Sequence, residues 1–97
     1  MGARREVTLD LTGCKKSWEI HQKIKETLNF PDYYGCNWDA FWDCLRFECP
    51  MEYIRVVGEQ TIPEDVRKCL TAMHELLEEC KKERTAFGLN FDYEIAD

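Results

Sequence analysis

The chain has 97 residues, with 19 Asp and Glu against 13 Lys and Arg, which gives a formal net charge of -6. This length accommodates one domain, residues 1–97, and leaves no room for a second. The acidic balance argues against direct binding to nucleic acid or to an anionic membrane, because phosphate groups are bound chiefly by clustered Lys and Arg. We therefore expect a basic protein partner.

The sequence carries no recognisable targeting signal. Residues 1–6 lack the apolar core of a signal peptide, Glu6 stands where a myristoylation signal needs Ser or Thr, and no long apolar run follows. We therefore expect a cytoplasmic protein, in which the six cysteines are free thiols. There is no Cys-x-x-Cys pair, and His21 and His74 stand far along the chain from any close pair of cysteines, so we expect no metal and no cofactor.

The first half of the chain predicts one strand and two helices. Residues 6–11 alternate between apolar and polar side chains and close at Thr12-Gly13, which is typical of a half-buried strand. Ser17 is a candidate N-cap for a helix whose apolar residues recur every four positions up to Leu28. A second, shorter helix follows, with Asn37 as its candidate N-cap and Pro50 as its limit.

The second half predicts a strand, a long helix and a last strand. Residues 51–57 are rich in strand-forming side chains and end at Gly58. A helix then opens at Pro63 and runs to about Arg84, and alternation resumes after Gly88. Each connection between strands is long enough to carry a helix, so we predict an α/β fold with a small three-stranded parallel sheet packed with helices.

Residues 30–52 concentrate both aromatic side chains and acids. Seven of the twelve aromatic residues lie between Phe30 and Phe47, and the segment has five carboxylates against one base, Arg46. A surface that is both aromatic and acidic suits a cationic partner. This segment is the candidate functional site.

Asp39 and Asp43 are four residues apart, so a helix places them on one face, where their repulsion costs roughly 0.2–0.5 kcal/mol. The helix N-terminus offsets part of this cost at Asp39, and Asp43 has a candidate partner in Arg46, three residues on. On spacing alone, a capped helix with a solvated acidic face is the simpler interpretation. The neighbouring Tyr33 and Trp42 favour a binding surface, because exposed aromatic residues mark such surfaces.

The motif Pro31-x-Tyr33-Tyr34-Gly35-x-Asn37-x-Asp39-Ala40-x-Trp42-Asp43-Cys44-Leu45 resembles the signature segment of the barstar family, intracellular protein inhibitors of secreted microbial ribonucleases. The resemblance implies a compact α/β domain with no catalytic activity of its own. It also implies a monomer that forms a 1:1 complex with a basic, barnase-like ribonuclease or a related nuclease toxin.

The resemblance also assigns contacts with the ribonuclease. It places the Asp43 carboxylate in the enzyme's active site in place of a substrate phosphate, with Asp39 as its acidic neighbour. Tyr33 matches the family's tyrosine that packs on a catalytic histidine, and Glu83 matches a further acidic contact. The complete set of implied partner-binding residues is Tyr33, Asn37, Asp39, Trp42, Asp43 and Glu83.

Three features depart from the family's pattern. The turn at residues 46–50 is shorter than in the best-known member and lacks its Gly-Trp, Arg46 adds a positive charge beside the acids, and Phe87 stands where that member has another acid. Two alternatives stay open on the residues alone. One is a regulatory module that binds another basic protein without inhibiting a nuclease, and the other is an enzyme that uses Asp39, Asp43 and Glu83 as acid, base or Mg²⁺ ligands.

Overall fold

The computed structural model describes residues 5–96, so residues 1–4, on which part of the targeting expectation rests, lie outside the described residues. Three parallel strands form one sheet in the order β1-β2-β3, with bounds Glu6–Asp10, Tyr53–Val57 and Asp92–Ile95. Leu9 pairs with Val56, and Val56 pairs in turn with Ile95 on the far side of β2. The predicted three-stranded parallel sheet is confirmed.

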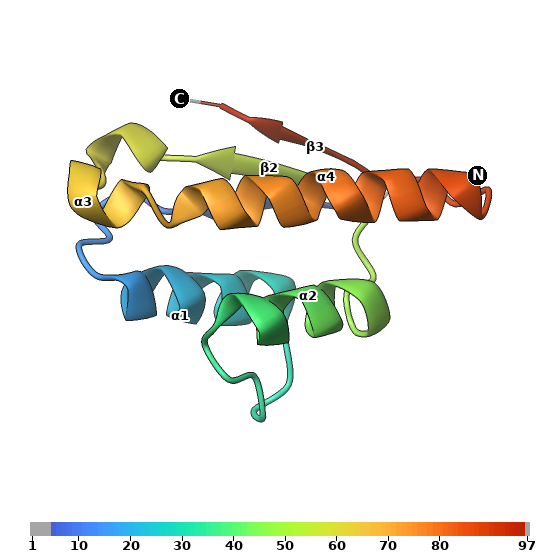
Figure 1. The fold of residues 1–97 in the computed structure, drawn as a ribbon, viewed down its shortest axis with the longest axis horizontal. Coiled ribbons are helices and arrows are strands. Elements are labelled where there is room, and N and C mark those ends of the chain that lie inside the picture. Colours follow the sequence, from blue (N-terminus) through green and yellow to red (C-terminus); the bar gives the residue numbers. More distant parts are fainter. Residues whose placement is uncertain (1–4, 97) are drawn as a thin grey trace.

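The helices cover one face of this sheet (Figure 1). They are α1 (Ser17–Leu28), α2 (Trp38–Phe47), α3 (Glu64–Arg67) and α4 (Leu70–Ala86), with a short 3₁₀ helix, η1 (Glu59–Thr61), after β2. α1 packs on β1, α4 on β3, and α2 against α4. The predicted α/β fold class is therefore confirmed.

The long helix predicted from Pro63 to about Arg84 is wrong in one respect, because the chain is interrupted between α3 and α4. At the junction the amide of Cys69 donates to Val66 O at 3.0 Å and that of Thr71 to Lys68 O at 3.3 Å. These bonds span three residues rather than four and tighten the turn, which separates a four-residue helix from the long one.

The start of α1 also differs by one residue from the prediction. Lys16, and not Ser17, is the N-cap. Glu19 supplies the capping interaction, because its Oε1 accepts hydrogen bonds from the backbone N–H groups of Lys15 and Lys16 at 2.8 and 2.9 Å. A carboxylate in this position satisfies free amide donors and is favoured by the helix dipole.

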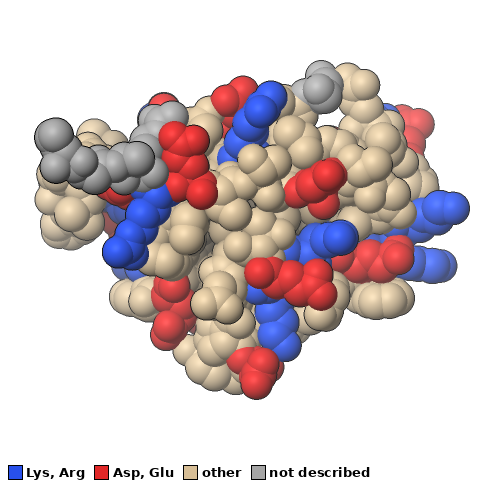
Figure 2. All heavy atoms as spheres, turned by 180° about the vertical axis from the view of Figure 1, so that it is seen from behind, with Lys and Arg blue, Asp and Glu red and all other residues tan. Residues whose placement is uncertain are grey.

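Charged side chains of both signs are distributed over the surface. Figure 2 shows one face of the molecule, on which acidic and basic side chains are intermingled and no extended area of one sign appears. Ion pairs join Lys25 to Asp32 (3.6 Å), Arg55 to Glu94 (4.0 Å) and Lys81 to Asp92 (3.1 Å). On that face, therefore, there is no basic area of the kind that binds nucleic acid.

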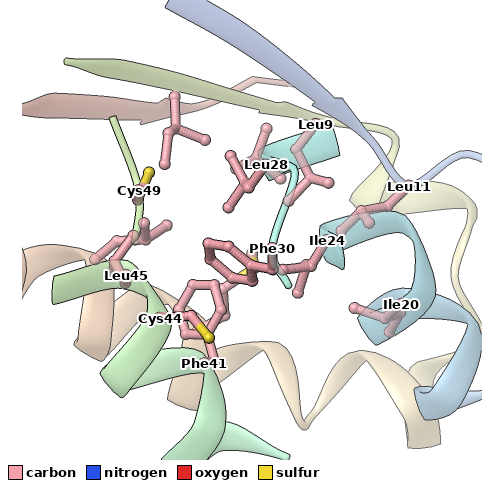
Figure 3. Close-up of a cluster of buried hydrophobic side chains, with 14 of the residues drawn as sticks. Leu9, Leu11, Ile20, Ile24, Leu28, Phe30, Phe41, Cys44, Leu45 and Cys49 are labelled. Carbon is pink, nitrogen blue, oxygen red and sulfur yellow. The ribbon is translucent and has the colours of Figure 1, made fainter. Parts of the chain in front are cut away.

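The hydrophobic core lies between the sheet and the helices. Figure 3 shows Leu9 of β1, Ile24 of α1 and Phe41 and Leu45 of α2 converging on Phe30, and all five side chains are buried. Strand residues next to the buried ones, such as Thr8 in β1 and Arg55 in β2, are exposed on the other face of the sheet, which is the pattern of a sheet covered on one side only. The core therefore fixes α2 at its inner face and leaves its outer face to solvent.

All six cysteines are free in this structure, and Cys36 is exposed. Burial raises the pKa of the thiols of Cys14, Cys44, Cys49 and Cys80, in the last case to about 11. A thiol with a raised pKa is a poor nucleophile at neutral pH, so these cysteines act as small apolar side chains.

Two structural features are absent from residues 5–96. No helix there has the length and apolar character needed to cross a membrane. Among the same residues, no group of three or more His, Cys, Asp and Glu side chains is placed to hold a metal ion. The arrangement expected of a Mg²⁺-dependent enzyme, with several carboxylates converging on one ion, is not among the described residues.

Candidate functional site

The loop between α1 and α2, residues 29–37, projects from the lower edge of the molecule in Figure 1. Asn29 and Cys36 adopt left-handed backbone conformations with φ of 56° and 51°. Between them the amide of Tyr34 donates to Pro31 O at 3.0 Å and closes a turn. These local reversals carry the chain out from α1 and return it to the start of α2.

The adjacent tyrosines of this loop point in opposite directions. Tyr34 is 5% exposed, and its hydroxyl lies 2.6 Å from His21 Nδ1. Tyr33 is 72% exposed, and its hydroxyl donates to Glu48 Oε1 at 3.0 Å. Tyr34 therefore lies in the core with its hydroxyl paired. Tyr33, in contrast, presents a ring to solvent that Glu48 holds in place.

His21 of α1 holds the loop through side-chain contacts in the protein interior. Its ring is buried, and its centre lies 4.4 Å from that of Trp38, the first residue of α2. Burial lowers the pKa of His21, because desolvation disfavours the imidazolium form. The hydrogen bond to Tyr34 and the ring contact with Trp38 thus connect α1 to the loop and to the start of α2.

Acidification is expected to destabilise the fold through His21. The pKa of His21 in the folded state lies below its ordinary value of 6.5, so the unfolded chain binds more protons. The contribution of His21 to stability is therefore fully present above about pH 6.5 and is lost as the pH falls toward the lowered pKa. His21→Gln removes the titrating group, and urea unfolding between about pH 5.5 and 7.5 should show a flatter pH dependence than in the parent. Equal slopes in the two proteins would contradict this expectation.

Asn37 is the N-cap of α2, as the sequence predicts. Its Oδ1 accepts from the amide of Ala40 at 2.8 Å, and its Nδ2 donates to Gly35 O at 3.1 Å. Both ends of the side-chain amide are thus used within the protein, although the residue is exposed. Asn37 therefore positions the helix relative to the loop, which is a different task from the partner contact that the resemblance implies.

Asp39 and Asp43 lie one helical turn apart on the exposed face of α2. Asp39 is in the first turn, where the helix dipole favours a negative charge. Among the described residues, neither carboxylate has an ion-pair partner or an intramolecular hydrogen bond. Both are therefore available to an external cation.

The pairing of Asp43 with Arg46 that the sequence allowed does not form. Arg46 Nε instead donates to Glu83 Oε1 of α4 at 2.9 Å. The guanidinium carbon also lies 5.2 Å from the ring centre of Trp42 and 5.0 Å from that of Phe47. Arg46 thus leaves Asp43 unpaired and neutralises Glu83, another of the acids that the resemblance places at the interface.

A groove with a volume of about 370 Å³ runs between α2 and α4 beside these acids. Its walls combine indole rings and small apolar side chains with one carboxylate from each helix. The main lining residues are Trp38, Asp39, Trp42, Ala72, Glu75 and Leu76. Aromatic rings and carboxylates together attract cations, so the groove extends the acidic surface of α2 toward α4.

The structure brings four of the six predicted site residues together on α2 and its N-cap: Asn37, Asp39, Trp42 and Asp43. Glu83 is connected to them through Arg46 and Trp42, whereas Tyr33 lies on the loop and contacts Glu48. The sequence analysis did not identify Glu75, the acid that α4 contributes to the groove. Glu75 and Glu83 are eight residues apart, and this spacing could have indicated that they share one face of a helix.

Arg84, near the C-terminal end of α4, binds the backbone at the end of α2 and in the turn that follows it. Its guanidinium is partly buried and donates to three backbone carbonyls, Leu45 O at 2.8 Å, Met51 O at 3.1 Å and Cys49 O at 3.2 Å. It therefore fixes the C-terminal end of α2 and the following turn to α4. No local pattern in the sequence signals this role.

Comparisons with known proteins identify the family to which the sequence is similar. A family model described as "Barstar (barnase inhibitor)" matches residues 4–95. The chain is also 44% identical over 41 residues to a protein of Bacillus subtilis (strain 168) named "Putative ribonuclease inhibitor YrdF". That match covers 42% of this chain and 45% of the relative, so the chain spans less than half the length of the relative it matches.

Proposed function

Because the chain belongs to the barstar family, we propose that it inhibits a secreted, basic, barnase-like ribonuclease or a related nuclease toxin by placing the carboxylates of α2 in the enzyme's active site. The observation that supports this most directly is the pair Asp39 and Asp43. Both are exposed on a helix fixed by the core and by Asn37, and neither has an ion-pair partner among the described residues. The family and the name of the relative point to an inhibitor rather than an enzyme.

The proposed mechanism rests on mimicry of the substrate's charge. A ribonuclease must hold a phosphodiester, so its cleft carries Lys, Arg and His side chains. Carboxylates held at fixed positions can occupy this cleft and accept charge-assisted hydrogen bonds in place of phosphate oxygens. In this proposal Asp43 enters the cleft, Asp39 and Trp42 contact its rim, and Tyr33 packs its exposed ring on the enzyme. Inhibition then requires no chemical step in the inhibitor.

The loop of residues 29–37 and the start of α2 are held rigid by contacts within the protein. Asn37, Tyr34 and His21 hold the segment internally, so few degrees of freedom are lost when the surface binds. We further propose a 1:1 complex between monomers in the cytoplasm. Charge complementarity between an acidic inhibitor and a basic enzyme accelerates association toward about 10⁸–10⁹ M⁻¹s⁻¹ at low salt.

The test is to titrate the purified protein into barnase that is cleaving a fluorogenic RNA substrate. We expect cleavage to stop near one equivalent of the protein. Binding that leaves the ribonuclease active would support the alternative, a regulatory module for basic proteins. Full activity and no binding would refute the proposal for this enzyme class.

A further inference from the structure

Arg46 is held in one position by contacts on three sides. Nε donates to Glu83 Oε1 at 2.9 Å, and the guanidinium lies about equally far from the rings of Trp42 and Phe47, at 5.2 and 5.0 Å. Both side chains of the ion pair are about one-third exposed, 34% for Arg46 and 36% for Glu83. The cation therefore sits at the surface in a fixed orientation, within the area proposed to face the ribonuclease.

The contacts of Arg46 leave donors free. Its bond to Glu83 uses Nε, and among the described residues the two terminal amino groups have no hydrogen-bond partner. A guanidinium carries five N–H donors in a planar arrangement suited to carboxylates and phosphates. The free edge of Arg46 can therefore receive an acceptor from a partner, whereas a partner's Lys or Arg would meet a like charge.

We propose that Arg46 determines which ribonucleases this surface accepts. It withdraws Glu83 from the acids available to a partner and selects an enzyme that presents a hydrogen-bond acceptor, preferably a carboxylate, opposite the C-terminal end of α2. This inference rests on the proposed function, because it concerns the same surface. In this proposal Asp39 and Asp43 bind the cationic side chains of the active site. Arg46 favours enzymes with an acidic group beside that site and disfavours enzymes with a basic group there.

Barnase is the probe for the first claim, that Arg46 weakens binding to a ribonuclease with a basic group opposite it. Arg46→Met removes the charge and keeps an apolar stem on Trp42 and Phe47. Arg55→Met is the matched control, since Arg55 is exposed on β2 and alternates with the buried Ile54 and Val56. We expect Arg46→Met to bind barnase at least about tenfold more tightly than the parent, and Arg55→Met to stay within about twofold. Equal effects of the two substitutions would overturn the proposal.

A double-mutant cycle tests the neutralisation of Glu83. Glu83→Gln should weaken binding of the parent to barnase, because it leaves the Arg46 cation without its counter-charge beside a basic enzyme. In the Arg46→Met background the same substitution should remove most of the gained affinity. Unchanged affinity on Glu83→Gln in both backgrounds would overturn the proposal. If neither the parent nor Arg46→Met binds barnase at all, the inhibitor proposal itself fails, and the inference about Arg46 fails with it.

The second claim is that Arg46 favours an enzyme with a carboxylate opposite the C-terminal end of α2. It is tested with barnase variants in which single surface Lys or Arg residues are replaced by Glu. At one or more positions, the parent should bind the variant more tightly than unmodified barnase, whereas Arg46→Met should not gain. Such a reversal identifies the enzyme residue opposite Arg46. A complete series in which the parent and Arg46→Met respond in parallel would overturn the selection of an acidic partner group.

Discussion

Asp43→Ala is expected to weaken binding to the target ribonuclease by on the order of 2–5 kcal/mol or more, the largest loss from any single truncation on this surface. Asp43 is exposed on α2 and has no ion-pair partner among the described residues, so its charge is uncompensated in the free protein. In the complex we expect it to lie among cations away from water. Removing it leaves those cations buried and unpaired, which costs more than the loss of a surface contact.

Isothermal titration calorimetry on the purified pair measures this loss. Asp65→Ala is the matched control, because Asp65 is an exposed residue of α3 and the same unit of charge is removed away from α2. The control should lower the affinity only through the reduced overall charge. If Asp43→Ala binds within about twofold of Asp65→Ala, charge mimicry by Asp43 is wrong for this protein.

The features that the sequence predicted well depend on local chemistry. The strands follow from alternation, as around Leu9, and the cap of α2 follows from an Asn side chain three residues before Ala40 N–H. The exposed ring of Tyr33 fits the expectation that exposed aromatic residues mark a binding surface. For the strands and the cap, the deciding interaction spans a few residues or follows from the period of a single element.

One failure involves partners that are distant along the chain. Arg46 had a candidate partner in Asp43, three residues away, yet it pairs with Glu83, 37 residues away. That choice depends on how α2 packs against α4, which periodicity does not specify. The break between α3 and α4 has a different, local origin. The apolar residues continue through it without interruption, while the backbone hydrogen bonds change from a four-residue to a three-residue span.

The candidate site depends both on residues that are close in sequence and on contacts between helices that are distant in sequence. Its acids and aromatic residues are adjacent in sequence, so a composition count and a motif sufficed to find Asp39, Trp42 and Asp43. The contribution of α4, through Glu75 in the groove and Glu83 on Arg46, appears only when two helices meet in three dimensions. The contacts with a partner stay a prediction until a complex is measured.

Arg84→Met is expected to lower the free energy of unfolding by about 3 kcal/mol, the largest effect on stability among the substitutions considered. The guanidinium donates to Leu45 O, Cys49 O and Met51 O and lies 5.0 Å above the ring of Phe91. Methionine preserves part of the packing but leaves three partly buried carbonyls without this donor. Hydrogen bonds from a charged group contribute more than neutral ones, and the negative end of the α2 dipole adds to the attraction.

Urea unfolding followed by far-ultraviolet circular dichroism measures the loss. Lys82→Met is the control, because Lys82 is exposed on the same helix and the same charge is removed. We also expect Arg84→Met to bind the ribonuclease less tightly, since Arg84 joins the end of α2 to α4 and thereby sets the position of Arg46 relative to Glu83. Equal unfolding midpoints for Arg84→Met and Lys82→Met would show that the three carbonyl contacts do not stabilise the fold. Stability would then depend on the packing of the core alone, and the alignment of α2 with α4 would need another cause.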